Sequence, residues 1–452
     1  MKLVHIACTA IALGLAIGTT EARVPKEQAD RLGKDLTPFG SERGGSGDVP
    51  AWTGGLSSTP AGIKFDPKTQ NPPDPFAGDK VRFTITPANA AQYADRLMPG
   101  SKALLKLYGT YQINVYPSHR SCALPEFVYA ANKQNATAGE LTQDGEGVTG
   151  AAMGAPFPIA SNAMELMWDA KLKYRGFKVV RQYAVAPVQH GGGYSLITVQ
   201  DRAIVRWSDP SIKRAEDLKN IALYYIVNPL APPRLAGNIV LMHESLNSAV
   251  EPRKAWAYSP GTRRVRRAPD IAYDNVGTNT EAMSTADAID GFNGAMDRYD
   301  WGVLGRSALF IPYNDYAAVT GKYADLLGPT HLNQSLVRYE AHRVWNIEAK
   351  LKPGQRHIYV RRVFHIDEDS HGIAGVEIYD GRGTLWRFQE LQNTIAYHVP
   401  VCAVGAEAVY DLIGQRYLVS GMRNQEPPID FFASDLKEDD FTPEAMRSLG
   451  VR

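Results

Sequence analysis

From residue 177 onward, the chain alternates between short apolar runs and turn residues. The run over Val337–Ala349 is the clearest case, because hydrophobic and polar side chains take alternate positions along much of its length. Eleven runs of this kind, mostly joined by short turns, predict a large antiparallel β-sheet. They are Phe177–Pro187, Tyr194–Trp207, Ile221–Val227, Asn238–Ser248, Arg253–Tyr258, Arg263–Arg267, Val337–Ala349, His357–Asp367, Ile373–Asp380, Thr384–Leu391 and Gln415–Ser420. A sheet of this size must curl, and helices packed in its concavity would cover its core.

Helical patterns precede the strands. Thr86 followed by proline is typical of a helix start, and the helix should run to about Leu97. A second helix is expected over Ser101–Tyr108, and a strand over Tyr111–Tyr116. A short capped helix is expected at the C-terminus after Phe441. The chain is therefore predicted to be an α+β protein.

A third helix is expected over Ala163–Tyr174, capped by Ser161 or Asn162. Its large apolar residues include Met164, Met167 and Trp168. Core packing is the simpler interpretation of these side chains. The alternative is that adaptable methionines line an apolar cavity.

The stretch from Lys254 to Trp301 combines two different patterns. Turn residues around Pro260 predict a β-hairpin, in which Trp256 and Tyr258 share one face of the first strand. The residues from Ser284 to Trp301 predict a surface-crossing helix, too poor in apolar positions to be buried outright. Together they suggest an aromatic-lined sheet beneath a movable helical lid.

The N-terminus predicts export. A positive start, an apolar run over residues 6–18 and small residues before Arg23 are typical of a secretory signal over residues 1–22. That run is too short to span a bilayer. An acylated cysteine would have to follow the run, whereas Cys8 stands at its beginning. The expected location is therefore the periplasm, without a lipid anchor.

Beyond the signal, the sequence predicts an arm and one domain. Residues 23–80 are rich in glycine and proline and form the arm, and residues 81–452 form a single domain. Two cysteines remain, Cys122 and Cys402, and in an oxidising compartment they most simply form a disulfide. A reactive thiol is the alternative.

The chain offers little catalytic chemistry. The net charge of +1 gives no support to nucleic-acid binding, and the nucleophile-elbow, zinc-protease and phosphate-loop motifs are missing from the sequence. The acidic cluster from His365 to His371 is interpreted as a solvated turn, so neither a metal nor a cofactor is expected. Asp287, Asp290 and Asp297 could form an acid pair, but exposed carboxylates explain them more simply.

Arginines near the hairpin allow two interpretations. A charged edge strand that resists aggregation is one, and a rim that attracts an anionic head group is the other. The residues concerned are Arg263, Arg264, Arg266 and Arg267. Arg343 and Arg362 interrupt the apolar faces of their strands, and an inward arginine must be paired.

Several motifs carry a resemblance. Trp256-Ala-Tyr-Ser-Pro-Gly-Thr-Arg263, Asp290-Gly-Phe-Asn-Gly-Ala-Met296 and Gly383-Thr-Leu-Trp386 are similar to a domain-of-unknown-function family of secreted Gram-negative proteins described as outer-membrane lipoprotein-sorting-like. The resemblance implies the LolA/LolB fold, an incomplete antiparallel barrel closed by helices over a hydrophobic cavity. It implies no catalytic residue, and it suggests proximity to proton-driven export pumps.

We therefore expect a periplasmic binding or carrier protein for a lipid, an acyl chain or another hydrophobic amphiphile. The alternatives are a secreted hydrolase that uses acidic residues near Asp290 or Asp367, and a scaffold that contacts a membrane transporter without carrying anything. The expected cavity or lid residues are Met164, Met167, Trp168, Trp256, Tyr258, Phe292, Met296, Trp301, Trp345 and Trp386.

Overall fold

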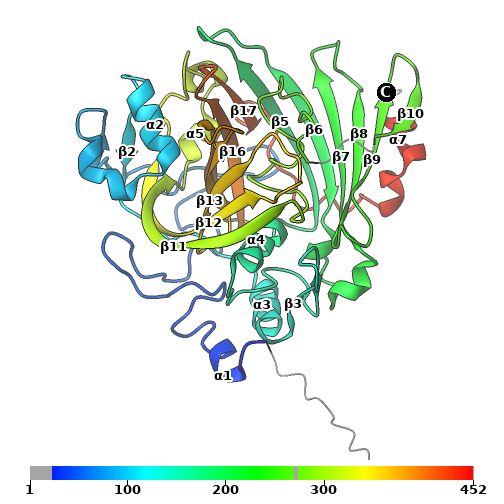
Figure 1. The fold of residues 1–452 in the computed structure, drawn as a ribbon, viewed down its shortest axis with the longest axis horizontal. Coiled ribbons are helices and arrows are strands. Elements are labelled where there is room, and N and C mark those ends of the chain that lie inside the picture. The colour runs from blue at the N-terminus through cyan, green and yellow to red at the C-terminus, as the bar shows by residue number, and fades with distance from the viewer. Residues whose placement is uncertain (1–22, 269–272, 451–452) are drawn as a thin grey trace, which may run out of the picture.

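The computed structural model describes residues 23–268 and 273–450, so the predicted signal segment lies outside the described residues. Fifteen strands form one sheet in the order β1-β2-β12-β13-β14-β15-β16-β17-β5-β6-β7-β8-β9-β10, with β11 beside β12 (Figure 1). They are β1 (Phe83–Ile85), β2 (Ile113–Val115), β5 (Lys178–Val188), β6 (Ile197–Ile204), β7 (Ile221–Ala231), β8 (Ile239–Ser245), β9 (Lys254–Ser259), β10 (Arg264–Arg267), β11 (Tyr299–Pro312), β12 (Tyr339–Leu351), β13 (Arg361–Asp367), β14 (Ile373–Tyr379), β15 (Leu385–Ala396), β16 (Val401–Asp411) and β17 (Arg416–Met422). A separate pair is formed by β3 (Glu140–Leu141) and β4 (Val148–Thr149).

The predicted antiparallel sheet is confirmed. Its neighbouring strands pair antiparallel except at one parallel contact, between Tyr339 of β12 and Val115 of β2. The strand order ends at β1 and β10, so the sheet is unclosed. The predicted hairpin is also confirmed, because Tyr258 of β9 faces Val265 of β10.

The helices are short. They are α1 (Lys26–Ala29), α2 (Pro99–Leu107), α3 (Glu126–Ala138), α4 (Ala163–Leu172), α5 (Tyr316–Thr320), α6 (Tyr323–Leu326) and α7 (Pro443–Gly450), with 3-10 turns η1 (Ala90–Arg96), η2 (Arg206–Ser208), η3 (Ala215–Leu218) and η4 (Glu438–Phe441). The cap predicted at Asn162 is confirmed, because its side chain accepts from the Glu165 N–H at 3.0 Å. The Thr86 helix is wrong, because the Thr86 N–H donates to the Asn89 side chain and only η1 follows.

The helical lid predicted over Ser284 to Trp301 is also wrong. Residues 281–298 form no helix, and β11 begins at Tyr299. Asp290 and Gly291 have φ values of +59° and +86°, which a right-handed helix does not allow. We call residues 273–298 the strap.

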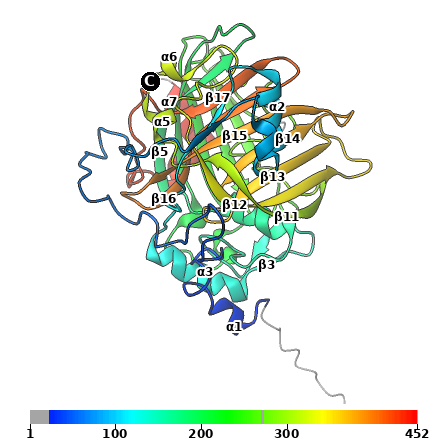
Figure 2. The same cartoon turned by 90° about the vertical axis from the view of Figure 1, so that its left-hand side faces the viewer.

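The sheet has two differently covered faces. Leu391 and Val409 point to the inner face, whereas Phe388 and Tyr410 point to the outer face. Helix α2 packs on the outer face beside β14 and β15 (Figure 2), and α7 packs on it at the opposite end of the sheet (Figure 1). The curvature encloses the inner face, which is covered by α4 and the strap.

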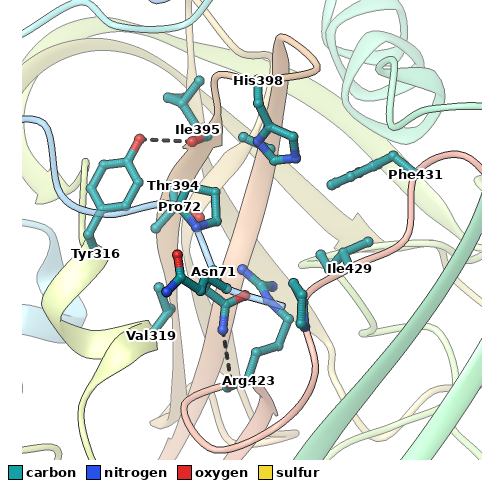
Figure 3. Close-up of a pocket in the computed structure, with 13 residues that line it drawn as sticks. Asn71, Pro72, Tyr316, Val319, Thr394, Ile395, His398, Arg423, Ile429 and Phe431 are labelled. Carbon is teal, nitrogen blue, oxygen red and sulfur yellow. Dashed lines mark hydrogen bonds between the residues drawn. The ribbon is translucent and has the colours of Figure 1, made fainter. Parts of the chain in front are cut away.

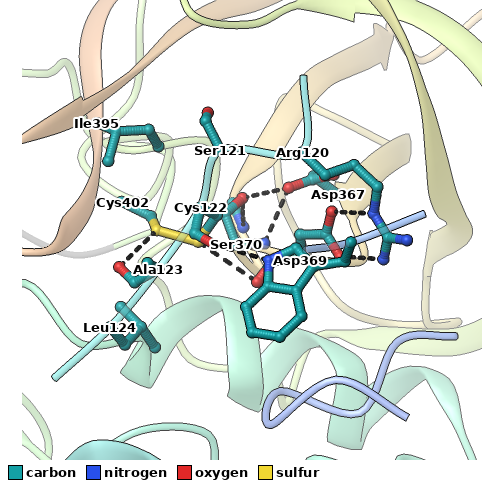
Figure 4. The surroundings of a disulfide bond; sticks show 12 residues. Arg120, Ser121, Cys122, Ala123, Leu124, Asp367, Asp369, Ser370, Ile395 and Cys402 are labelled. Carbon is teal, nitrogen blue, oxygen red and sulfur yellow. Dashed lines mark hydrogen bonds and ion pairs between the residues drawn. A yellow bond between two sulfur atoms is a disulfide. The ribbon is translucent and has the colours of Figure 1, made fainter. Parts of the chain in front are cut away.

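The glycine- and proline-rich arm packs against the domain. Phe39 and Trp52 are buried in a cluster with Tyr397 at the end of β15. This cluster surrounds the disulfide between Cys122 and Cys402 (Figure 4). None of the described helices is long and apolar enough to cross a lipid bilayer.

Candidate functional site: the inner face and its strap

The inner face carries two apolar patches. In the first, Met167 of α4 packs with Ile347, Phe364 and Leu391 from three neighbouring parts of the sheet. The second patch lies on β16, β17 and β5 to β9, and it includes Val227 and Met242. Their side chains alternate with outward-pointing ones along each strand, which is how one sheet supplies an apolar lining on this side.

Apolar side chains of the strap fill both patches. Met283 packs in the second patch, and Phe292 and Met296 pack in the first. All three are at most 2% exposed. Phe292 meets the rings of Trp301 and Phe364 edge-on, with centroids 5.4 and 5.8 Å apart. The strap therefore covers the apolar side chains of both patches.

Ion pairs at Asp287 and Asp290 anchor the middle of the strap. The Asp287 carboxylate lies 2.6 Å from the Arg362 guanidinium and 3.1 Å from His357 Nε2. Burial raises the pKa of Asp287, but Arg362 and His357 more than offset this and hold the pKa well below its usual range. The expectation that Arg362 must be paired is thereby confirmed.

The second anchor is Asp290, which pairs with Lys173 at 3.1 Å and with Arg175. Its backbone N–H donates to the carboxylate of Glu407, on β16, at 3.1 Å. Burial, together with the charge of Asp290, raises the pKa of Glu407 to about 7. Burial lowers the pKa of Lys173 to about 8. This anchor therefore contains groups that titrate near neutral pH.

Beyond these anchors, the strap is held by contacts to its backbone. Lys171 of α4 donates to the carbonyl of Gly294 at 2.6 Å, and Arg253 donates to that of Asn293 at 2.9 Å. The Met296 N–H donates to Glu146 at 3.1 Å. Between residues 291 and 298, no carboxylate of the strap forms a buried ion pair of the kind that Asp287 and Asp290 make.

Water reaches the inner face beside the strap. Arg181 of β5 pairs with Asp201 of β6 at 2.7 Å, and its side chain is 32% exposed, whereas that of Asp201 is 2% exposed. Desolvation is nevertheless the largest influence on the pKa of Arg181, although Asp201 and Tyr225 raise it overall. Arg181 is thus partly open to solvent on the inner face.

The expected cavity residues lie in three places. Met167, Phe292 and Met296 are brought together in the first patch, with Met164, Trp301, Trp345 and Trp386 at its margin. Trp168 lies in a neighbouring cluster with Trp207. Trp256 and Tyr258 lie on the outer face against α7, because the alanines between them take the inner side.

The expected arginine rim lies on an edge strand. Arg264, Arg266 and Arg267 of β10 are exposed, as is Arg263 in the preceding turn. The Arg267 guanidinium lies 5.9 Å from the Trp256 ring. These arginines are separate from the strap anchors, which come from β13 and the end of α4.

The acidic turn from His365 to His371 is buried rather than solvated, which corrects the expectation. Asp367 and Asp369 are 1% and 3% exposed. Asp369 pairs with Arg120 at 2.7 Å beside the disulfide (Figure 4). Glu368 pairs with Arg343 at 3.1 Å, so this inward arginine also has a partner. The carboxylates can be buried because they pair with arginines that are distant in the sequence, and the residues of the turn alone do not indicate these partners.

Two hollows lie away from the strap. An apolar cavity of about 30 Å³ lies between the arm, α5, the end of β15 and the segment before α7 (Figure 3). It is lined by Gln70, Asn71, Pro72, Tyr316, Val319, Thr394, Ile395, Ala396, His398, Arg423, Pro428, Ile429 and Phe431. It has room for one or two water molecules, which is too small for an acyl chain. A groove of about 590 Å³ lies between α1 and α3.

These features define an unclosed antiparallel sheet whose inner face is filled by an irregular strap. The family described as "Protein of unknown function (DUF1329)" matches residues 84–447. A Pseudomonas aeruginosa protein named "Uncharacterized protein PA3922" is 42% identical over 449 residues, covering 98% of this chain and 97% of that protein. The chain therefore belongs to the DUF1329 family, and the expected membership is confirmed.

Solved structures give more distant likenesses. An outer membrane lipoprotein-sorting protein domain from Vibrio parahaemolyticus has a TM-score of 0.43 at 13% identity, covering 63% of this chain and 97% of that one. A DUF1329 family protein from Desulfovibrio piger has a TM-score of 0.41 at 14% identity (60% and 92% covered). The LolA superfamily protein NE2245 from Nitrosomonas europaea has a TM-score of 0.39 at 12% identity, covering 63% of this chain and 100% of that one. At such TM-scores, the likeness indicates neither a ligand nor a partner.

Proposed function

We propose that this protein is a periplasmic binding or carrier protein for a hydrophobic amphiphile, which it holds between the inner face and the strap. The observation that carries the proposal is the position of Phe292 and Met296, which fill an apolar patch from a segment without regular secondary structure. An apolar ligand can take the place of such side chains, since both present similar surface to the sheet.

The magnitudes make this exchange feasible. Withdrawing Phe292 and Met296 costs about 3–6 kcal/mol in lost apolar burial, at about 1.5–3 kcal/mol per side chain. An acyl chain of about ten methylene groups recovers about 8 kcal/mol at about 0.8 kcal/mol each. The ion pairs of Asp287 and Asp290 would stay in place, because breaking a buried pair costs about 3–5 kcal/mol.

The polar end of the proposed ligand would bind Arg181 on the inner face. Arg181 is partly exposed there, while Asp201 holds its guanidinium in place. Its Nε donates to Asp201 and its Nη2 to the Tyr225 hydroxyl, and an anionic head group can bind the remaining N–H groups of the guanidinium. The proposed ligand is therefore an amphiphile with one apolar chain and an anionic head.

The geometry supports the hydrolase alternative less well. Asp290 is held by Lys173 and Arg175, and Asp367 is 1% exposed. A general acid and base must both reach a substrate, and these carboxylates lie in separate clusters. The scaffold alternative rests on the exposed arginines of β10, and a salt-sensitive membrane partner recovered without bound lipid would favour it.

The test uses the mature protein purified from the periplasm. An organic-solvent extract is analysed by mass spectrometry for lipid, and 11-(dansylamino)undecanoic acid is titrated into delipidated protein. Phe292→Ala should raise the affinity about tenfold or more. The substitution weakens the state in which the strap fills the patch, and it leaves intact the side chains of the sheet that would contact the ligand. Trp256→Ala, on the outer face, is the matched control and should leave the affinity unchanged. If the wild type yields no lipid and binds no probe, or if Phe292→Ala binds as the wild type does, the proposal is wrong.

A further inference from the structure

Three side chains converge outside the strap region. His342 of β12, Asp367 at the end of β13 and Asp369 in the following turn each place one donor atom within 4.8 Å of the others. They are 1%, 1% and 3% exposed. The two aspartates come from the acidic turn, and the pairing of β12 with β13 brings His342 to them.

Two polar atoms at this cluster have no hydrogen-bond partner among the described residues. One is Asp367 Oδ1 and the other is the hydroxyl of Tyr313. The Tyr313 ring stacks on the His342 ring with centroids 3.8 Å apart. Burial and then the charges of Asp367 and Asp369 raise the pKa of Tyr313. Each unsatisfied buried group costs about 1–3 kcal/mol, which calls for a further partner.

The spacing fits an ion better than a direct hydrogen bond. His342 Nδ1 and Asp367 Oδ1 are 3.8 Å apart, which is too far for a hydrogen bond. Two ligand atoms that each lie about 2.0–2.2 Å from a tetrahedral metal ion are about 3.3–3.6 Å apart, so a small closure of this pair would bring both atoms to one ion. Nε2 of His342 faces Glu340 at 3.3 Å, so its Nδ1 is turned toward Asp367.

The surroundings hold the donors in place. Arg120 and Ser41 both bind the Asp369 carboxylate, at 2.7 Å each. The hydroxyl and N–H of Ser370 donate to the other oxygen of Asp367, at 2.6 and 2.9 Å. Outer partners of this kind orient ligating carboxylates in metal sites.

We propose that His342, Asp367 and Asp369 bind one divalent transition-metal ion, with Zn²⁺ as the first candidate. One imidazole with carboxylate oxygens suits Zn²⁺ or Mn²⁺. The enclosed donors make the ion structural. It would join β12 and the β13–β14 turn to the segment of the disulfide, since Cys122 Sγ lies 3.6 Å from the Asp369 carbonyl. The site is independent of the strap and of its ligand.

The test measures metal directly. Mature protein without an affinity tag is analysed by inductively coupled plasma mass spectrometry after dialysis against EDTA. We expect about one Zn²⁺ or Mn²⁺ per chain, retained by the folded protein and released only on unfolding. Asp367→Asn and His342→Gln should each lower the content to below about a tenth of an equivalent. Asp169→Asn changes an equally buried carboxyl on α4 and should keep the ion.

A second measurement covers the case in which the variants do not fold. Wild-type protein unfolded in urea and EDTA is refolded with chelator or with Zn²⁺, and its thermal midpoint is compared. The metal should raise the midpoint. Absence of stoichiometric metal in protein purified from metal-supplemented medium and refolded with Zn²⁺ or Mn²⁺ would overturn the proposal, as would full metal content in folded Asp367→Asn.

Discussion

Asp287 of the strap and Arg362 of β13 form an ion pair at 2.6 Å, although their side chains are only 2% and 1% exposed. The partners are 75 residues apart in the sequence, and the Arg362 guanidinium also lies 5.3 Å from the Phe292 ring of the first apolar patch. The strap is therefore a fixed part of the folded core at Asp287. Residues 291–298, its C-terminal part, are held without such an anchor.

Removing the carboxylate of this pair should be costly. Asp287→Ala leaves the Arg362 charge buried without its partner, and we expect the free energy of unfolding to fall by about 3–5 kcal/mol. Asp297→Ala removes an exposed carboxylate of the same strap and should cost less than about 1 kcal/mol. Urea unfolding followed by circular dichroism measures both, and equal effects would contradict the assignment of the anchor.

The pH dependence of stability should carry the signature of Glu407. Its pKa is raised to about 7 in the folded protein, above the value in the unfolded chain. The folded state then binds more protons between about pH 4.5 and 7, so this group makes stability fall as pH rises through that window. Glu407→Gln keeps an oxygen to accept from Asp290 and Gln389, and it should lose less stability than the wild type between pH 5 and 8. An identical loss in both proteins would refute the shift.

Packing of α2 on the sheet should be intolerant of one added methyl group. A Cβ at Gly100 would lie 2.0 Å from the ring of Phe388, which is fully buried. We expect Gly100→Ala to lower the free energy of unfolding by about 1–3 kcal/mol, although alanine favours a helix. At Gly109 nothing lies within 4 Å of the added Cβ, so Gly109→Ala should be close to neutral.

The disulfide should contribute strongly to stability, because it joins residues 280 positions apart. Replacing both cysteines by alanine should lower the free energy of unfolding by about 2–5 kcal/mol. Denaturant titration of this variant beside the oxidised wild type measures the difference. Coincident transitions would show that the link adds no stability.

Local patterns were sufficient for the sheet and for α4. Alternation predicted most strands, and the Asn162 cap placed the helix start within the correct turn. Two long strands were missed. Strand β11 was missed because Gly302 and Gly305 interrupt its apolar pattern. Strand β16 was missed because small residues such as Ala406 and Ala408 have little β propensity.

The candidate sites depend on distant pairings that no local pattern contains. The strap anchors join Asp287 to Arg362, and the metal cluster joins His342 to Asp369 through the register of β12 and β13. The faces of Trp256 and Tyr258 were assigned correctly relative to each other. Which of the two faces would be inner depended on the placement of α7.

Hydrogen–deuterium exchange of residues 291–298, with and without bound 11-(dansylamino)undecanoic acid, tests the central claim most directly. If an amphiphile replaces Phe292 and Met296 on the inner face, these amides should exchange faster in the complex, while those near Asp287 keep their protection. A saturated complex in which residues 291–298 remain as protected as in the free protein would contradict the account.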